Sequence, residues 1–139
     1  PGMVERGAGA VLNVASTAAF QPLPTQATYS ASKAFVLTFT QALRADLHGT
    51  GVAATVLCPG PVHTEFGEVA GLEQEAAALP DFVFVPSPEV AEAGVGGLES
   101  DKGVVIPGAL NKVTAVGGQF TPRRLLLGLG RRVYRLGDS

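Results

Sequence analysis

The sequence contains a single cysteine, Cys58, only two histidines and no long run of apolar residues. One cysteine excludes a disulfide framework and a cysteine-based metal site, and we expect His48 and His63 in solvent or loop packing rather than on a metal. No stretch approaches the roughly 18 uninterrupted apolar residues of a membrane span. The opening residues, with Glu5 before a short apolar run, lack the pattern of a signal peptide. We therefore expect a cytoplasmic protein.

Aromatic residues and positive charge are also scarce. Aromatic residues make up 6% of the 139 residues and the formal net charge is −2, which argues against nucleic-acid binding. The charges are unevenly distributed, because residues 65–101 hold nine of the twelve acidic residues and neither Lys nor Arg, while residues 123–135 hold five of the ten basic residues. Both segments are typical of solvated faces. The hydrophobic content of 46% is enough for the core of one globular domain.

Apolar runs and helical periodicity predict an α/β fold. Short apolar runs predict buried strands at residues 9–16, 51–58 and 102–108. Periodic apolar residues and capping signals predict helices at residues 25–48, 65–78, 88–97 and 121–136, the last of them basic and amphipathic. Strands separated by helices indicate parallel pairing with right-handed crossovers. We predict one partial domain, residues 1–139, with three parallel strands and flanking helices.

Tyr29 and Lys33, in the sequence YSASK, lie on one face of the predicted long helix because they are four residues apart. A phenol is too weak an acid to serve as a base at neutral pH, but a neighbouring ammonium favours its ionised form. Ser16 ends the first predicted strand, where its hydroxyl could face the phenol and hydrogen-bond a carbonyl oxygen. The three side chains together predict a site for proton transfer coupled to hydride transfer.

Motifs along the chain resemble the second half of a short-chain dehydrogenase/reductase of the classical type. They are VLNVAS, YSASK with its Tyr thirteen residues after Ser16, PGPVHT after the second strand, VVIPG, and the ending TPRRLLLGLGRRV. The resemblance spans nearly the whole chain. It implies a Rossmann-like, doubly wound sheet and an oxidoreductase that uses NAD or NADP to act on an alcohol or carbonyl substrate.

The resemblance also implies roles for the matching residues. Tyr29 would be the general acid/base, Lys33 would favour its ionised form and bind the nicotinamide ribose, and Ser16 would hold the substrate oxygen. Asn13 would help to organise the strand end. The implied cofactor-binding residues are Tyr29, Lys33, Pro59, Gly60, Val62 and Thr64.

The glycine-rich phosphate-binding loop of this family has no counterpart in the sequence. GAGAVL, at residues 7–12, has Leu12 where the third glycine of GxGxxG belongs, and GVGGLE fails in the same way at Glu99. We therefore expect either a partial gene product or a chain completed by a second polypeptide. Either case would leave an unpaired edge on the first strand.

Three further interpretations remain open. Ser30 and Lys33 form the S-x-x-K pattern of acyl-transferring serine enzymes, although the companion motifs K-T-G and S-D-N are missing. The chain could instead be a catalytically silent assembly module that dimerises through the 25–48 helix, as family members commonly do. Residues 121–136 could dock on a protein or lie on an anionic membrane.

Residues 65–85 are expected to form a mobile segment that covers the substrate. Their large apolar side chains are Phe66, Leu72, Leu79, Phe82 and Phe84. These side chains favour an apolar substrate.

Overall fold

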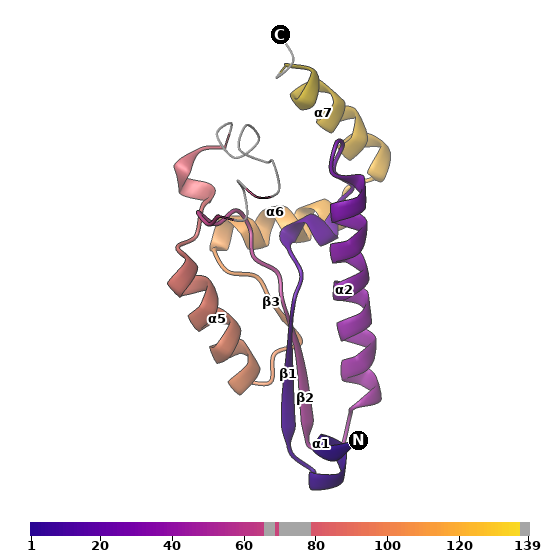
Figure 1. Ribbon diagram of the computed structural model, residues 1–139. Coiled ribbons are helices and arrows are strands. Elements are labelled where there is room, and N and C mark those ends of the chain that lie inside the picture. The colour runs from indigo at the N-terminus through magenta and orange to yellow at the C-terminus, as the bar shows by residue number, and fades with distance from the viewer. Residues whose placement is uncertain (66–68, 70–78, 137–139) are drawn as a thin grey trace.

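The computed structural model describes residues 1–65, 69 and 79–136, and within the last helix it describes side chains only up to residue 129. A parallel sheet with the strand order β1-β2-β3 forms the centre, with α2 on one side and α5 on the other (Figure 1). The strands are β1 (Gly9–Val14), β2 (Val52–Leu57) and β3 (Val104–Val105). This is the predicted α/β class with three parallel strands.

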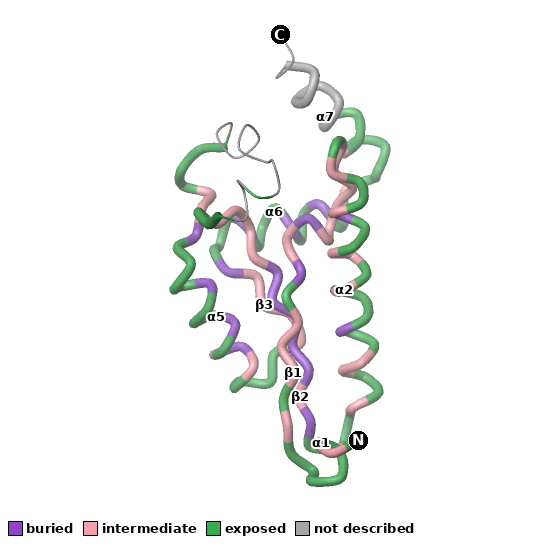
Figure 2. Tube along the Cα trace, viewed as in Figure 1, coloured by how far each residue is buried: buried purple, intermediate pink, exposed green. Residues whose placement is uncertain are grey.

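Alternation along β2 divides the core into two layers. Val56 packs in a cluster with Leu37 of α2 (Ala27–Asp46), whereas the next residue, Leu57, packs with Val90 of α5 (Ser87–Glu99). Successive side chains of a strand point to opposite faces, so β2 needs apolar residues at almost every position. Figure 2 shows the buried residues concentrated along this central strand. The apolar run of residues 51–58 predicted β2 for this reason.

The remaining elements are shorter or lie outside the sheet. They are α1 (Gly2–Arg6), the 3₁₀-helices η1 (Thr17–Phe20) and η2 (Asp81–Val83), α6 (Ala109–Phe120) and α7 (Arg123–Leu136). The predicted helices at 25–48, 88–97 and 121–136 correspond to α2, α5 and α7, each within about two residues at its ends. The predicted helix at 65–78 and most of the expected cover at 65–85 lie outside the described residues.

Helix α6 was not predicted from the sequence. Its buried positions are Asn111, Ala115 and Gly118, while the large side chains of Leu110 and Val113 are 41% and 69% exposed. A buried stripe of Asn, Ala and Gly gives no hydrophobic signal, although its spacing of three to four residues is helical. The helix was therefore recognised only from the structure.

Strand β1 is an edge strand in the described part of the chain, as expected. Helix α7 extends away from the sheet beyond α6 (Figure 1). Within the described residues, no helix has the length and apolar character that crossing a lipid bilayer requires.

Arg44 connects α2 to the turn between α5 and β3. Its Nη1 lies 2.7 Å from Oδ1 of Asp101, and its Nη2 donates to the backbone oxygen of Asp101 at 2.8 Å. Nη1 also donates to the backbone oxygen of Ala54 in β2 at 3.2 Å. The hydrogen bond from Arg44 lowers the pKa of the Asp101 carboxyl. The guanidinium thus joins a helix, a strand and a turn.

We predict that Asp101→Asn will make the free energy of unfolding less dependent on pH. A lowered folded-state pKa stabilises the protein above the unfolded value of about 3.9, and this stabilisation is lost as the pH falls through the folded value. Asn tolerates the left-handed backbone at this position, where φ is 52°. Urea unfolding from about pH 3 to about pH 7 would measure the difference. Asp46→Asn, at the exposed end of α2, is the control, and an identical pH dependence in Asp101→Asn would contradict the prediction.

Candidate active site

Ser16 lies just beyond β1 and caps η1. Its backbone is extended, and its Oγ accepts a hydrogen bond from the backbone N–H of Ala18 at 3.1 Å. The backbone N–H of Thr17 donates to the oxygen of Pro59 at 2.8 Å, which joins this strand end to the turn after β2. Both strands are parallel, so their carboxyl ends meet at the edge of the sheet where open α/β folds bind ligands. The Ser16 hydroxyl is therefore held at this edge.

Tyr29 and Lys33 stand one turn apart on α2. The ammonium Nζ of Lys33 lies 5.7 Å from the centre of the Tyr29 ring, within cation–π range. The same nitrogen donates to the backbone oxygen of Val14, at the end of β1, at 3.4 Å. Lys33 therefore bridges the helix and the strand end, and it brings positive charge close to the phenol ring.

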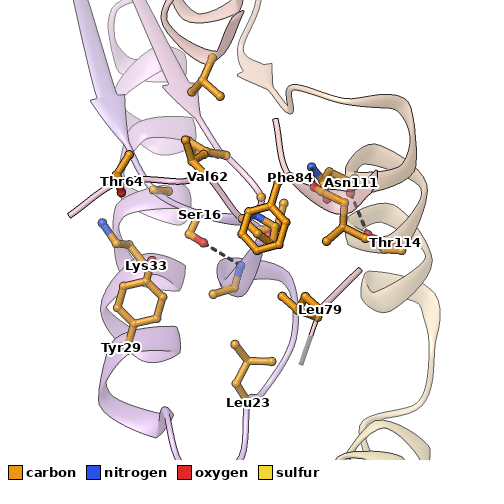
Figure 3. Close-up of a pocket in the computed structure, with 18 of the residues that line it drawn as sticks. Ser16, Leu23, Tyr29, Lys33, Val62, Thr64, Leu79, Phe84, Asn111 and Thr114 are labelled. Atoms are coloured by element: carbon orange, nitrogen blue, oxygen red, sulfur yellow. Dashed lines mark hydrogen bonds between the residues drawn. The ribbon is translucent and has the colours of Figure 1, made fainter. Parts of the chain in front are cut away.

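The predicted site residues border one cavity of about 700 Å³. The members that line it are Ser16, Tyr29, Lys33, Pro59, Gly60, Val62 and Thr64. Figure 3 shows Tyr29 and Lys33 on one side of this cavity and Asn111 and Thr114 on the other. Elements that are far apart in the sequence thus contribute to a single concave site, which is the usual form of a small-molecule pocket.

Asn13 does not line the cavity. Its Nδ2 donates to Oγ1 of Thr40 at 3.0 Å, and Thr40 is fully buried on α2. The Thr40 hydroxyl in turn donates a hydrogen bond to the backbone oxygen of Val36 at 2.7 Å. The hydrogen bond of Asn13 thus links β1 to α2. It fixes the end of β1, which Ser16 follows, relative to the helix that carries Tyr29.

The far wall of the cavity contains residues that sequence reasoning missed. Leu110, Asn111 and Thr114 come from the unpredicted α6, and Leu23 comes from the loop between η1 and α2. The only sequence signal was the helical spacing of Leu110 and Thr114. Leu79 and Phe84, which were expected to cover the substrate, also line the cavity, whereas Phe82 is exposed.

Asn111 links α6 to η2 and to the loop that follows β3. Its buried side chain donates from Nδ2 to the backbone oxygens of Val83 at 3.2 Å and Pro107 at 3.4 Å. A Cβ on Gly60 would overlap the Asn111 side chain. Glycine at position 60 therefore permits close packing of α6 against the turn that follows β2, a requirement that the PGPVHT motif alone does not reveal.

Two nearby nucleophilic residues, Ser30 and Cys58, do not line the cavity. Ser30 is buried, and its Oγ donates to the backbone oxygen of Ala27 at 3.1 Å, so its geometry does not support the S-x-x-K interpretation. Cys58 is fully buried, and burial raises the pKa of its thiol to about 11. His63 stacks on Phe84 with ring centres 4.0 Å apart, in agreement with loop packing.

Comparisons with known proteins all identify the same family. The model of the short chain dehydrogenase family matches residues 1–75. The ketoacyl reductase HetN of Nostoc is 33% identical over 97% of this chain, and sulfoacetaldehyde reductase 2 of Chromohalobacter salexigens is 47% identical over 56% of it. These matches cover 46% and 31% of the two relatives, so the chain spans at most about half of their length.

A solved structure matches the entire fold. The short-chain dehydrogenase of Sphingobium yanoikuyae, determined in complex with NADPH, is 27% identical, with a TM-score of 0.70 over 100% of this chain and 49% of its own. The parallel sheet and the helix that carries YSASK are consistent with the family match, which covers more than half of the sequence. The chain therefore belongs to the short-chain dehydrogenase family.

Proposed function

We propose that this chain forms the catalytic half of an NAD- or NADP-dependent oxidoreductase that acts on an alcohol or carbonyl substrate. The observation that carries the proposal is the meeting of Ser16, Tyr29 and Lys33 at one cavity beyond the carboxyl ends of β1 and β2. Family membership and the NADPH complex of the Sphingobium relative support the choice of cofactor.

The cavity has the size and donors to accept the nicotinamide end of such a cofactor. Its volume is about 700 Å³, and Lys33 and Thr64 offer an ammonium and a hydroxyl on its wall. Tyr29, Pro59, Gly60 and Val62 would complete the cofactor side. When bound, the nicotinamide supplies or accepts the hydride. We propose that residues outside this sequence bind the phosphates, because the sequence has no glycine-rich loop.

Residues of this chain would transfer the proton and stabilise the charges that form. In carbonyl reduction, the Tyr29 hydroxyl gives its proton to the substrate oxygen as the hydride reaches the carbonyl carbon, and the product is an alcohol. Ser16 donates a hydrogen bond to the same oxygen and stabilises its developing negative charge. Lys33 stabilises the phenolate that remains, because its cation lies close to the ring. Alcohol oxidation follows the same steps in reverse.

Measurement of hydride transfer tests this function. We expect the protein, expressed as its gene encodes it, to bind NADPH or NADH saturably and to consume the reduced cofactor when a ketone is added. The 139-residue chain alone is expected to bind the cofactor weakly. Absence of turnover with both cofactors across a panel of ketones and alcohols would overturn the proposal and favour the assembly-module alternative.

The exposed face of α2 supports a role in homo-oligomer formation. Phe35 and Phe39 are 68% and 50% exposed and stack with ring centres 5.8 Å apart. Exposed aromatic pairs of this kind are typical of interface cores. We propose that a second copy of the chain covers them. Arg123, Arg124, Leu125 and Leu129 of α7 are also exposed, and docking or anionic-membrane contact through this helix stays a prediction.

We predict that the double change Phe35→Glu and Phe39→Glu will convert the oligomer to a monomer. Four buried carboxylates in a dimer interface would lose their hydration without gaining cations. Sedimentation equilibrium would measure the mass. Phe120→Glu is the matched control, because Phe120 is 81% exposed at the end of α6 and should leave the mass unchanged. An oligomer that survives the double change would show that α2 is not the interface.

A further inference from the structure

Large apolar side chains line much of the cavity away from Lys33, beside the polar groups of Asn111 and Thr114. They are Leu23, Leu79, Val83, Phe84, Val90 and Leu110. In Figure 3, Leu23, Leu79 and Phe84 lie between the Tyr29 side of the cavity and the Asn111 side. A substrate whose carbonyl oxygen reaches Ser16 and Tyr29 would therefore place its remaining groups against hydrocarbon.

Positive charge is confined to one point of this cavity. Among the described lining residues, Lys33 is the only one with a charged side chain. Its Nζ already donates a hydrogen bond to the backbone oxygen of Val14 and lies close to the Tyr29 ring. Lys112 lies on α6 between lining residues, but it is exposed and does not line the cavity. In the part of the chain that the structure describes, the far wall thus has no cation that could pair with an anionic substrate group.

The segment expected to cover the cavity cannot supply the missing cation. Residues 65–101 contain nine acidic residues and no Lys, Arg or His, so this conclusion holds wherever the segment lies. An anion that enters a site lined in this way loses hydration without gaining a cationic partner. An uncharged apolar group gains from burial in the same place.

We propose that the substrate is an uncharged ketone or secondary alcohol with a bulky apolar group, and that the site disfavours carboxylate, sulfonate and phosphate substrates. This inference rests on the proposed function, which requires only some alcohol or carbonyl. It separates the chain from its sulfoacetaldehyde reductase relative, whose named substrate is a sulfonate. Leu110 contributes to the selectivity because it places hydrocarbon on the wall opposite the catalytic residues.

A matched pair of ketones tests the inference. Methyl 4-acetylbenzoate and 4-acetylbenzoate share the same aryl ketone and differ in the charge of one substituent. We expect the ester to have a kcat/KM at least about tenfold higher, in line with the cost of burying an anion without a cationic partner. Ligand-detected NMR on the same protein measures binding of both compounds without requiring hydride transfer. Equal or higher kcat/KM or binding for the carboxylate would overturn the proposal.

The variant Leu110→Lys adds a cation to the far wall. We expect it to improve the carboxylate relative to the ester by about tenfold, because opposite charges attract strongly in a partly enclosed site. Val113→Lys is the control, since Val113 is on the same helix but does not line the cavity, and it should keep the wild-type ratio. Thr114→Lys, also on the lining face of α6, replaces Leu110→Lys should that variant fail to fold. An unchanged ratio in the folded variant would contradict the role of Leu110.

The two readouts separate this inference from the proposed function. Preferential NMR binding of the ester, together with no turnover across the panel of ketones and alcohols, would refute the oxidoreductase function and leave the pocket preference intact. Turnover that favours the carboxylate would refute the substrate class and leave the function intact. Failure of both compounds to bind would refute the inference about the cavity.

Discussion

Replacing Tyr29 with phenylalanine is expected to lower the rate of hydride transfer by about 100- to 10,000-fold. The change removes only the hydroxyl to which we assign the proton transfer. The aromatic ring remains, so Lys33 keeps its position 5.7 Å from the ring centre and 3.4 Å from the backbone oxygen of Val14. The loss should appear in kcat, measured as consumption of the reduced nicotinamide, and cofactor binding should change little.

A neighbouring variant separates loss of chemistry from loss of structure. Ser32→Ala removes an exposed hydroxyl that donates to the backbone oxygen of Tyr29 at 2.7 Å, and it should leave kcat nearly unchanged. Tyr29→Phe is expected to alter the free energy of unfolding by about 1 kcal/mol. A Tyr29→Phe protein that retains most of its kcat would remove Tyr29 from the catalytic role and with it the basis of the proposed mechanism.

Gly51→Ala is expected to destabilise the fold by about 3 kcal/mol. Gly51 precedes β2 with φ at 76°, a left-handed conformation that costs an L-residue about 1–2 kcal/mol. A Cβ at this position would also collide with the backbone oxygen of Gly7, just before β1. A backbone carbonyl cannot rotate away as a side chain can, so the starts of both strands would have to separate.

Gly49 provides a matched control for that collision. It has a similar φ of 79°, but a Cβ there meets no atom within 4 Å. Gly49→Ala should therefore cost only the conformational part, about 1 kcal/mol. Urea unfolding of both variants would isolate the contact with Gly7 as the difference. Equal costs would mean that the strand starts can move apart without penalty.

Elements with a dense apolar signal could be predicted from the sequence. Strand β2 is buried on both faces and therefore carries a continuous apolar run. Helix α2 shows clear periodicity, so its extent was predicted to within about two residues at each end. The third strand has only two residues in ladder pairing, far fewer than the apolar run at 102–108 suggested. Pairing depends on a neighbouring strand, which local sequence does not encode.

The near side of the candidate site could be predicted for a topological reason. Ser16 and Pro59 follow adjacent parallel strands, so their proximity follows from the order of the elements. The far side depends on how α6 packs, and Asn111 with Gly60 gives no local pattern that indicates this contact. The sequence thus predicted residues that meet at the near side of the cavity, whereas the far side could be described only from the structure.

The isolation of the Cys58 thiol makes the protein convenient for spectroscopic labelling. With a pKa of about 11 and no exposed surface, the native thiol has only about one part in ten thousand as thiolate at neutral pH, and reagents cannot reach it. A cysteine introduced at Phe82 or Phe120, both highly exposed, would therefore react selectively without prior removal of the native one. Probes at these two positions would report the distance between η2 and the end of α6 in the unaltered fold.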